Sequence, residues 1–183
     1  MSKKIRLILS ICILALCVGT LTFGVLAAVT KNNQVIGDVN FSAEDCDVAI
    51  YASTEGALNV DGQTNSSTWS REHLKDSDTW TLPVLCFDES NYPTVPDIKL
   101  IFEIINNSTV AALHITTQAG EIPQACSTTL KYDKVAWPDA GGITIEPQAT
   151  VTIEFSIRLV NTDENFSTSG KNLISFNFSV PTT

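Results

Sequence analysis

The chain has 183 residues, of which 44% are hydrophobic and 17% charged, and its net charge is −9. The first 28 residues contain three basic and no acidic side chains, so residues 29–183 carry eight basic and 20 acidic ones, a net charge of −12. A surface this acidic excludes nucleic acid as a partner and disfavours anionic lipid surfaces, because both need a basic footprint. The 155 residues after position 28 are enough for one domain with its own core.

The N-terminus has the pattern of an export signal. A basic start is followed by an almost wholly apolar run, Leu7–Val29. Ala27 and Ala28 supply the small residue that a signal peptidase needs, and the chain becomes polar directly afterwards. We therefore predict a signal peptide over residues 1–28, cut after Ala27 or Ala28, and an exported domain over residues 29–183.

The same run is long enough to cross a membrane, for which about 20 apolar residues suffice. The alternative is therefore an uncleaved anchor in the cytoplasmic membrane, formed by residues 7–29. Cleavage predicts a secreted or surface-held protein, with the export machinery and a signal peptidase as partners.

Alternating apolar residues after this segment predict β-strands. Val35, Val39 and Phe41 share one parity and predict a first strand, with Gly37 as its weak point. Residues 53–78 are polar and rich in turn residues, which predicts a long connection with few strands.

The second half has the clearest strand patterns. Residues 98–117 predict a hairpin with its turn at Asn106-Asn107-Ser108, and residues 151–159 and 174–180 alternate regularly. No helical period of useful length occurs. About seven to nine such strands predict an all-β fold, a single antiparallel β-sandwich of Ig-like or jelly-roll-like type.

The sequence offers no group of residues suited to catalysis. Its two histidines, His73 and His114, stand apart and outside a His-Glu-x-x-His motif, so we predict neither a metal site nor a cofactor. Ser169-Gly170-Lys171 lacks the first glycine of a phosphate-binding loop. Acidic loops offer oxygen ligands for Ca²⁺, but solvated loop charges explain them as well. We predict a protein that is not an enzyme and has no catalytic residues.

Three cysteines follow the signal segment: Cys46, Cys86 and Cys126. Cys46 and Cys86 stand on inward parities of predicted strands, so a disulfide, if one forms, is expected between them. The competing interpretation is that both are buried, reduced thiols.

Four segments of the chain resemble the TasA/camelysin group of exported Firmicute proteins. They are the apolar run that ends Gly24-Val25-Leu26-Ala27-Ala28, residues 39–50, residues 102–109 and residues 169–178. The resemblance implies a jelly-roll-like sandwich, secretion, and in some members assembly into biofilm-matrix fibres. Camelysin-type members are described as metallopeptidases, but none of the residues above supports that activity here.

Three functional hypotheses follow, of which the third, a protease, rests on the likeness to camelysin-type members alone. The first is a non-catalytic surface or matrix protein, whose partners are other matrix proteins or further copies of itself. In that case Val35, Val39 and Phe41 form an assembly strand that adds head-to-tail to a neighbouring sheet; alternatively, they pair within their own sheet. The second hypothesis is a secreted ligand-binding or glycan-binding module, with Trp69, Trp80 or Trp137 as a sugar platform unless they pack in the core.

Overall fold

The computed structural model describes residues 33–58, 62–89, 92–139, 141–162 and 165–181. The predicted signal or anchor segment, with its cleavage site at Ala27 and Ala28, lies outside the described residues. None of the described residues belongs to a helix long and apolar enough to cross a membrane.

The described chain is all-β, which confirms this part of the predicted fold. Thirteen strands occur in the described ranges, and nine of them have five or more residues. The long strands are β2 (Gly37–Ser42), β3 (Val48–Glu55), β4 (Thr68–Leu74), β5 (Ser77–Thr81), β7 (Ile98–Asn106), β8 (Leu113–Ala119), β9 (Cys126–Tyr132), β12 (Thr150–Leu159) and β13 (Lys171–Ser179). The short ones are β1 (Gln34–Val35), β6 (Leu85–Cys86), β10 (Val135–Ala136) and β11 (Ile143–Ile145).

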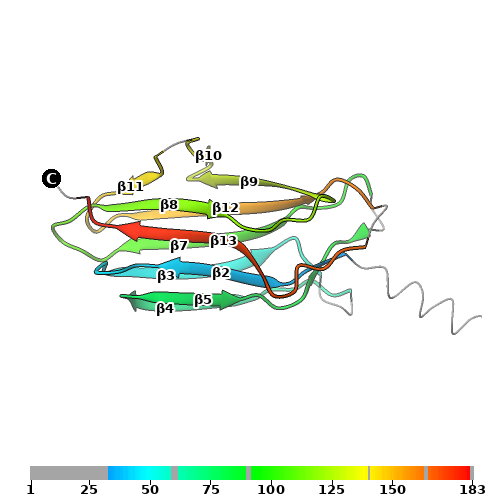
Figure 1. Ribbon diagram of the computed structural model, residues 1–183, viewed down its shortest axis with the longest axis horizontal. Coiled ribbons are helices and arrows are strands. Elements are labelled where there is room, and N and C mark those ends of the chain that lie inside the picture. Colours follow the sequence, from blue (N-terminus) through cyan, green and yellow to red (C-terminus); the bar gives the residue numbers. More distant parts are fainter. Residues whose placement is uncertain (1–32, 59–61, 90–91, 140, 163–164, 182–183) are drawn as a thin grey trace, which may run out of the picture. The chain divides into compact units, whose positions relative to one another are not determined.

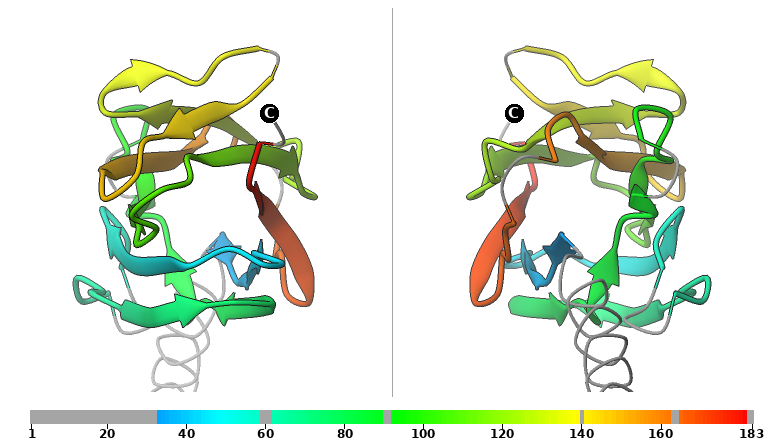
Figure 2. Two further views of the ribbon diagram at one scale, coloured as in Figure 1. Left: turned by 90° about the vertical axis from the view of Figure 1, so that its left-hand side faces the viewer. Right: turned by 90° about the vertical axis from the view of Figure 1, so that its right-hand side faces the viewer.

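Two larger sheets face each other in a sandwich-like arrangement (Figure 1). The six-stranded sheet has the order β10-β9-β12-β7-β3-β4, and the five-stranded sheet has the order β11-β8-β13-β2-β5. A third sheet consists of β1 and β6 alone. Seen end-on, the strands of the two larger sheets surround a common interior (Figure 2).

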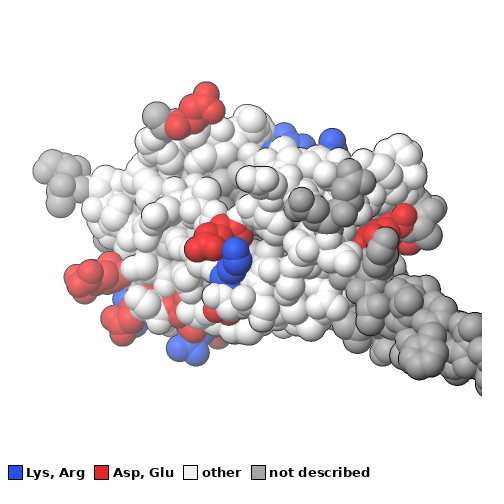
Figure 3. Space-filling view, turned by 45° about the vertical axis from the view of Figure 1, so that its right-hand side comes forward, with Lys and Arg blue, Asp and Glu red and all other residues white. Residues whose placement is uncertain are grey.

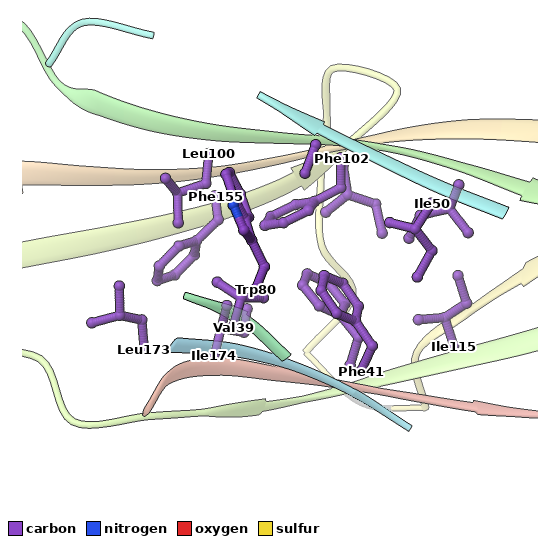
Figure 4. Packing of buried hydrophobic residues seen from close by; sticks show 14 of the residues in the cluster. Val39, Phe41, Ile50, Trp80, Leu100, Phe102, Ile115, Phe155, Leu173 and Ile174 are labelled. Carbon is purple, nitrogen blue, oxygen red and sulfur yellow. The ribbon is translucent and has the colours of Figure 1, made fainter. Parts of the chain in front are cut away.

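That interior is an aromatic and aliphatic core to which both sheets contribute (Figure 4). Phe41 of β2 and Phe176 of β13 stack with their ring centroids 5.6 Å apart. Phe102 of β7 meets the ring of Phe176 edge-on at 5.0 Å and that of Trp80 at 5.9 Å. Each of these rings is at most 3% exposed, so they join the two sheets through apolar burial.

Two features of the predicted topology are wrong. The sheets are not purely antiparallel, because β2 runs parallel to β13, the last strand of the described chain. Residues 98–117 are not a hairpin, because β7 pairs with β3 and β12 while β8 pairs with β11 and β13. The segment between β7 and β8 is therefore an arch from one sheet to the other.

The predicted connection over residues 53–78 is also wrong in part, because it contains β4 and the start of β5. β4 lies at an edge of the six-stranded sheet, and only its last residue, Leu74, is buried. An edge strand with five of its seven residues exposed needs no apolar alternation, so its sequence looks like a loop.

Candidate functional site

The outer face of the six-stranded sheet carries a groove. One part, of about 440 Å³, is lined by Ile101, Lys131, Asp133, Lys134, Thr152 and Glu154. A second part, of about 300 Å³, is lined by Tyr51, Ala52, Ser53, Thr68, Trp69, Ser70, Ile101, Glu103 and Thr152. Ile101 and Thr152 line both parts, so the two adjoin across the middle of the sheet. We call their combined surface the outer-face groove.

The strand register explains why these side chains meet. Alternate residues of a strand point to the same face, so residues in register across neighbouring strands form rows on that face. One row crosses five strands and contains Thr68, Ser53, Ile101, Glu154 and Lys131. The next row contains Ser70, Tyr51, Glu103 and Thr152. Polar side chains thus surround a half-buried isoleucine and a half-buried tyrosine.

A tight turn forms one end of the groove. Asp133 and Lys134 join β9 to β10 with φ angles of 43° and 70°, the left-handed pair that a two-residue hairpin turn requires. Asp133 fastens the turn to β12, because its N–H donates to the Thr152 carbonyl (2.8 Å) and its Oδ1 accepts from the Thr152 N–H (2.9 Å). The turn that carries Lys134 is therefore held against β12, and Lys131 lies in β9 itself.

Hydrogen bonds and ion pairs hold several polar groups of the groove. Glu154 lies 3.5 Å from the ammonium of Lys99 and accepts a hydrogen bond from Ser156 (3.0 Å). The hydroxyl of Tyr51 donates to Glu72 (3.1 Å), and this hydrogen bond is the main cause that raises the pKa of Tyr51. The tyrosine hydroxyl therefore stays protonated at neutral pH.

The opposite face of the molecule differs in character. The five-stranded sheet exposes neutral amide and hydroxyl side chains around a shallow depression of about 230 Å³, among them Asn40, Ser42, Thr79, Ser175 and Asn177. Figure 3 shows the molecule from this side, where one acidic and one basic cluster lie together near the middle of a surface that is otherwise largely uncharged. It provides a matched control surface for the groove.

The predicted assembly strand lies within the chain's own sheets in this structure. Val35 pairs with Leu85 in the small sheet, and Val39 and Phe41 lie in β2 between β13 and β5. All three are at most 1% exposed. The described arrangement is therefore the alternative in which the segment pairs within its own domain.

The structure does not bring Cys46 and Cys86 together, and both have the arrangement of the competing interpretation, that of buried, reduced thiols. All three cysteines are free thiols. Cys46 follows the C-terminal end of β2, whereas Cys86 pairs with Gln34 before β2 begins. Six residues of extended chain separate the two positions by about 20 Å. Burial raises the pKa of each thiol, to about 12 for Cys126, so the thiols stay protonated.

The two histidines lie in different sheets. Nδ1 of His73 in β4 is 3.0 Å from Asp47, and Nδ1 of His114 in β8 is 3.4 Å from the hydroxyl of Thr144. The hydrogen bond with His73, and then that from Asn107, lowers the pKa of the Asp47 carboxyl. The two contacts of Asp47 join the segment between β2 and β3 to β4 through His73 and to the β7–β8 arch through Asn107. Within the described ranges, no three His, Cys, Asp or Glu side chains are grouped to hold a metal ion.

The groove was not predicted from the sequence. Its signal was present in Tyr51 and Ile101, two large residues on the outward parity of β3 and β7 that stand next to polar residues of the same parity, such as Ser53 and Glu103. Of the three tryptophans considered as a sugar platform, only Trp69 lines the groove, and its ring stacks inward on Phe41 at 5.1 Å. Trp80 is buried in the core, and Trp137 packs edge-on against Tyr132. Neither the protein-family models nor the curated proteins include one that matches this chain.

Proposed function

We propose that the protein is an exported, non-catalytic protein of the cell surface or extracellular matrix that acts by binding a ligand in the outer-face groove. Three properties support this proposal. The chain begins with an export signal pattern, the remainder carries a net charge of −12, and a rigid sheet supports the groove.

The lining of the groove is the observation that carries the proposal. It combines an aliphatic side chain, an aromatic ring, hydroxyl groups and charges of both signs on five neighbouring strands. Such a mixture is typical of recognition sites, in which apolar contact provides affinity and a few polar groups fix orientation. Sites on strands also hold their side chains more rigidly than sites on loops.

The proposal includes the finer architecture, a single sandwich of Ig-like or jelly-roll-like type, and the likeness to matrix proteins of the TasA/camelysin group. Assembly through the N-terminal strand is the less favoured of the two modes of action. Val39 and Phe41 would first have to leave their pairs with β13 and β5. Binding by a folded, monomeric domain requires no such exchange.

Export and surface retention are tested together in a secreting bacterial host. We expect the protein in the culture medium or the cell-wall fraction. Its intact mass should be that of a chain whose first residue is Ala28 or Val29. Replacement of both Ala27 and Ala28 by Phe should block cleavage and leave the chain in the membrane fraction. Recovery of the unaltered chain in the cytoplasm only would contradict the proposal.

A further inference from the structure

We infer that the outer-face groove binds a short, uncharged oligosaccharide that lies across the strands of the six-stranded sheet. This inference rests on the proposed function and names the class of ligand for the same groove.

The direction of the groove indicates an elongated ligand. The row from Thr68 to Lys131 crosses β4, β3, β7, β12 and β9. Neighbouring strands are about 4.8 Å apart, so the row extends about 19 Å at right angles to the strands. A few linked sugar rings fit this length better than a single small molecule does.

The chemistry of the lining suits sugar rings, which have apolar C–H faces and hydroxyl edges. Ile101 and the ring of Tyr51 offer apolar surface near the middle of the groove. The exposed carboxylate of Glu103 accepts hydrogen bonds, the ammonium of Lys131 donates them, and the hydroxyl of Thr152 does both. Each sugar unit would therefore find apolar contact and hydrogen-bonding groups side by side.

The charges of the groove favour a ligand without net charge. Glu154 is already paired with Lys99. The other charged side chains of the lining balance, with two acidic and two basic: Glu103, Asp133, Lys131 and Lys134. Glu72 lies outside the lining, and its carboxylate accepts the hydrogen bond of the Tyr51 hydroxyl. A polyanion would meet the two carboxylates and the acidic molecule as a whole, and a polycation would meet the two ammonium groups.

A peptide strand fits the groove less well than a sugar chain. The floor is the face of the sheet, and its central strands β7 and β12 are each paired with a neighbour on both sides. A peptide lying on this face finds no free row of backbone N–H and C=O groups with which to form a ladder. A sugar needs only the side chains that point out of the face.

The test begins with a glycan array that displays neutral, sialylated and sulfated oligosaccharides. It continues with calorimetric titration of the purified protein with cellotetraose, chitotetraose and maltotetraose. We expect binding to neutral glycans, with weak or no binding to sulfated ones. Tyr51→Ala and Glu103→Ala should each weaken the best interaction about tenfold or more, because each removes a central contact. Asn177→Ala on the opposite sheet is the matched control and should leave affinity unchanged.

Circular dichroism and thermal unfolding establish that each variant is folded before affinity is compared. Absence of binding to every neutral glycan, stronger binding to sulfated glycans, or equal loss in the Asn177→Ala variant would each overturn the inference. The export experiment is independent of these results. A protein that reaches the cell surface but binds no glycan refutes the ligand class alone, whereas a protein retained in the cytoplasm refutes the proposed function.

Discussion

Asn106 shows how one polar side chain determines the path of the chain between the two sheets. It is 1% exposed at the end of β7. Its amide nitrogen donates to the carbonyls of Ala111 (2.9 Å), Ile145 (3.1 Å) and Glu146 (3.2 Å), and its Oδ1 accepts from the Ser108 N–H (3.1 Å). One side chain thereby satisfies backbone groups of the arch, of the last residue of β11 and of the residue that follows it.

Replacement of Asn106 by Ala should cost about 2–3 kcal/mol of unfolding free energy, because it leaves buried carbonyl groups without donors. Urea unfolding followed by tryptophan fluorescence measures the loss. Asn107→Ala is the control and should cost less than about 1 kcal/mol, since the Asn107 side chain bonds an exposed carboxylate. Equal stability of the Asn106→Ala variant and the unaltered protein would show that water replaces the amide.

The sequence predicts that polar residues connect β7 to β8, but it does not predict which of their side chains are buried. The pattern predicts a hairpin turn at Asn106-Asn107-Ser108, whereas these residues begin the arch, whose bends lie at Thr109 and Val110. The tripeptide contains no sign that the amide of Asn106 is buried while that of Asn107 is not. The cysteines show the same limit. The inward parity of Cys46 and Cys86 predicted burial correctly, yet parity does not specify the position along the sheet, so it could not show that the two lie far apart.

At the scale of elements, Gly37 explains how β2 and β13 approach each other. A Cβ at this position would lie 2.5 Å from the carbonyl oxygen of Lys171 and 3.1 Å from the side chain of Leu173. The sequence suggested that Gly37 weakens its strand. The structure shows that the absence of a side chain permits the close parallel pairing of the two strands.

Gly37→Ala should therefore destabilise the protein by about 1–3 kcal/mol, because either β13 must move away or the backbone must take up the strain. Thermal unfolding provides the measurement, with Asp38→Ala as the neighbouring control on the outward, half-exposed position. If the Gly37→Ala variant were as stable as the control, β13 would be able to move away from β2 without a loss of unfolding free energy.

Alternation of apolar residues locates strands but does not assign them to sheets. The patterns of β3, β7, β12 and β13 are clear because each has a buried face. Side chains alternate with a period of two in every strand. The pattern is therefore the same whether two strands form a hairpin or an arch, and whether they pair parallel or antiparallel. Pairing depends on contacts between residues far apart in the sequence, and the local pattern does not contain them.

At the scale of the whole molecule, the groove exists only after the sheet has assembled. Five strands, from residues 51 to 154, contribute its lining. Alternation along a strand indicates only that its outward-facing residues lie on the solvent side of a sheet. What it could not predict is the strand order that places Ile101 and Tyr51 among those hydroxyl and carboxylate groups.

The N-terminal segment is joined to the rest of the molecule well before β2 begins. The N–H of Asn33 donates to Glu89 (2.9 Å), and its side-chain oxygen accepts from the N–H of Phe166 (3.1 Å). The hydroxyl of Thr168 accepts from the N–H of Ile36 (2.8 Å) and donates to its carbonyl (2.6 Å). Three of these four bonds connect the segment to a loop more than 130 residues away, and the fourth connects it to Glu89, so the segment should be needed for folding.

Two truncated chains test this requirement. A chain that begins at Asn33 retains all of these contacts and should unfold cooperatively in urea. A chain that begins at Val39 loses β1, the contacts of Asn33 and Ile36, and the close approach at Gly37, so we expect it to lack a cooperative transition. Circular dichroism and sedimentation distinguish the outcomes. A folded, monomeric shorter chain, beside a longer chain that polymerises, would instead show that this segment acts on a neighbouring molecule.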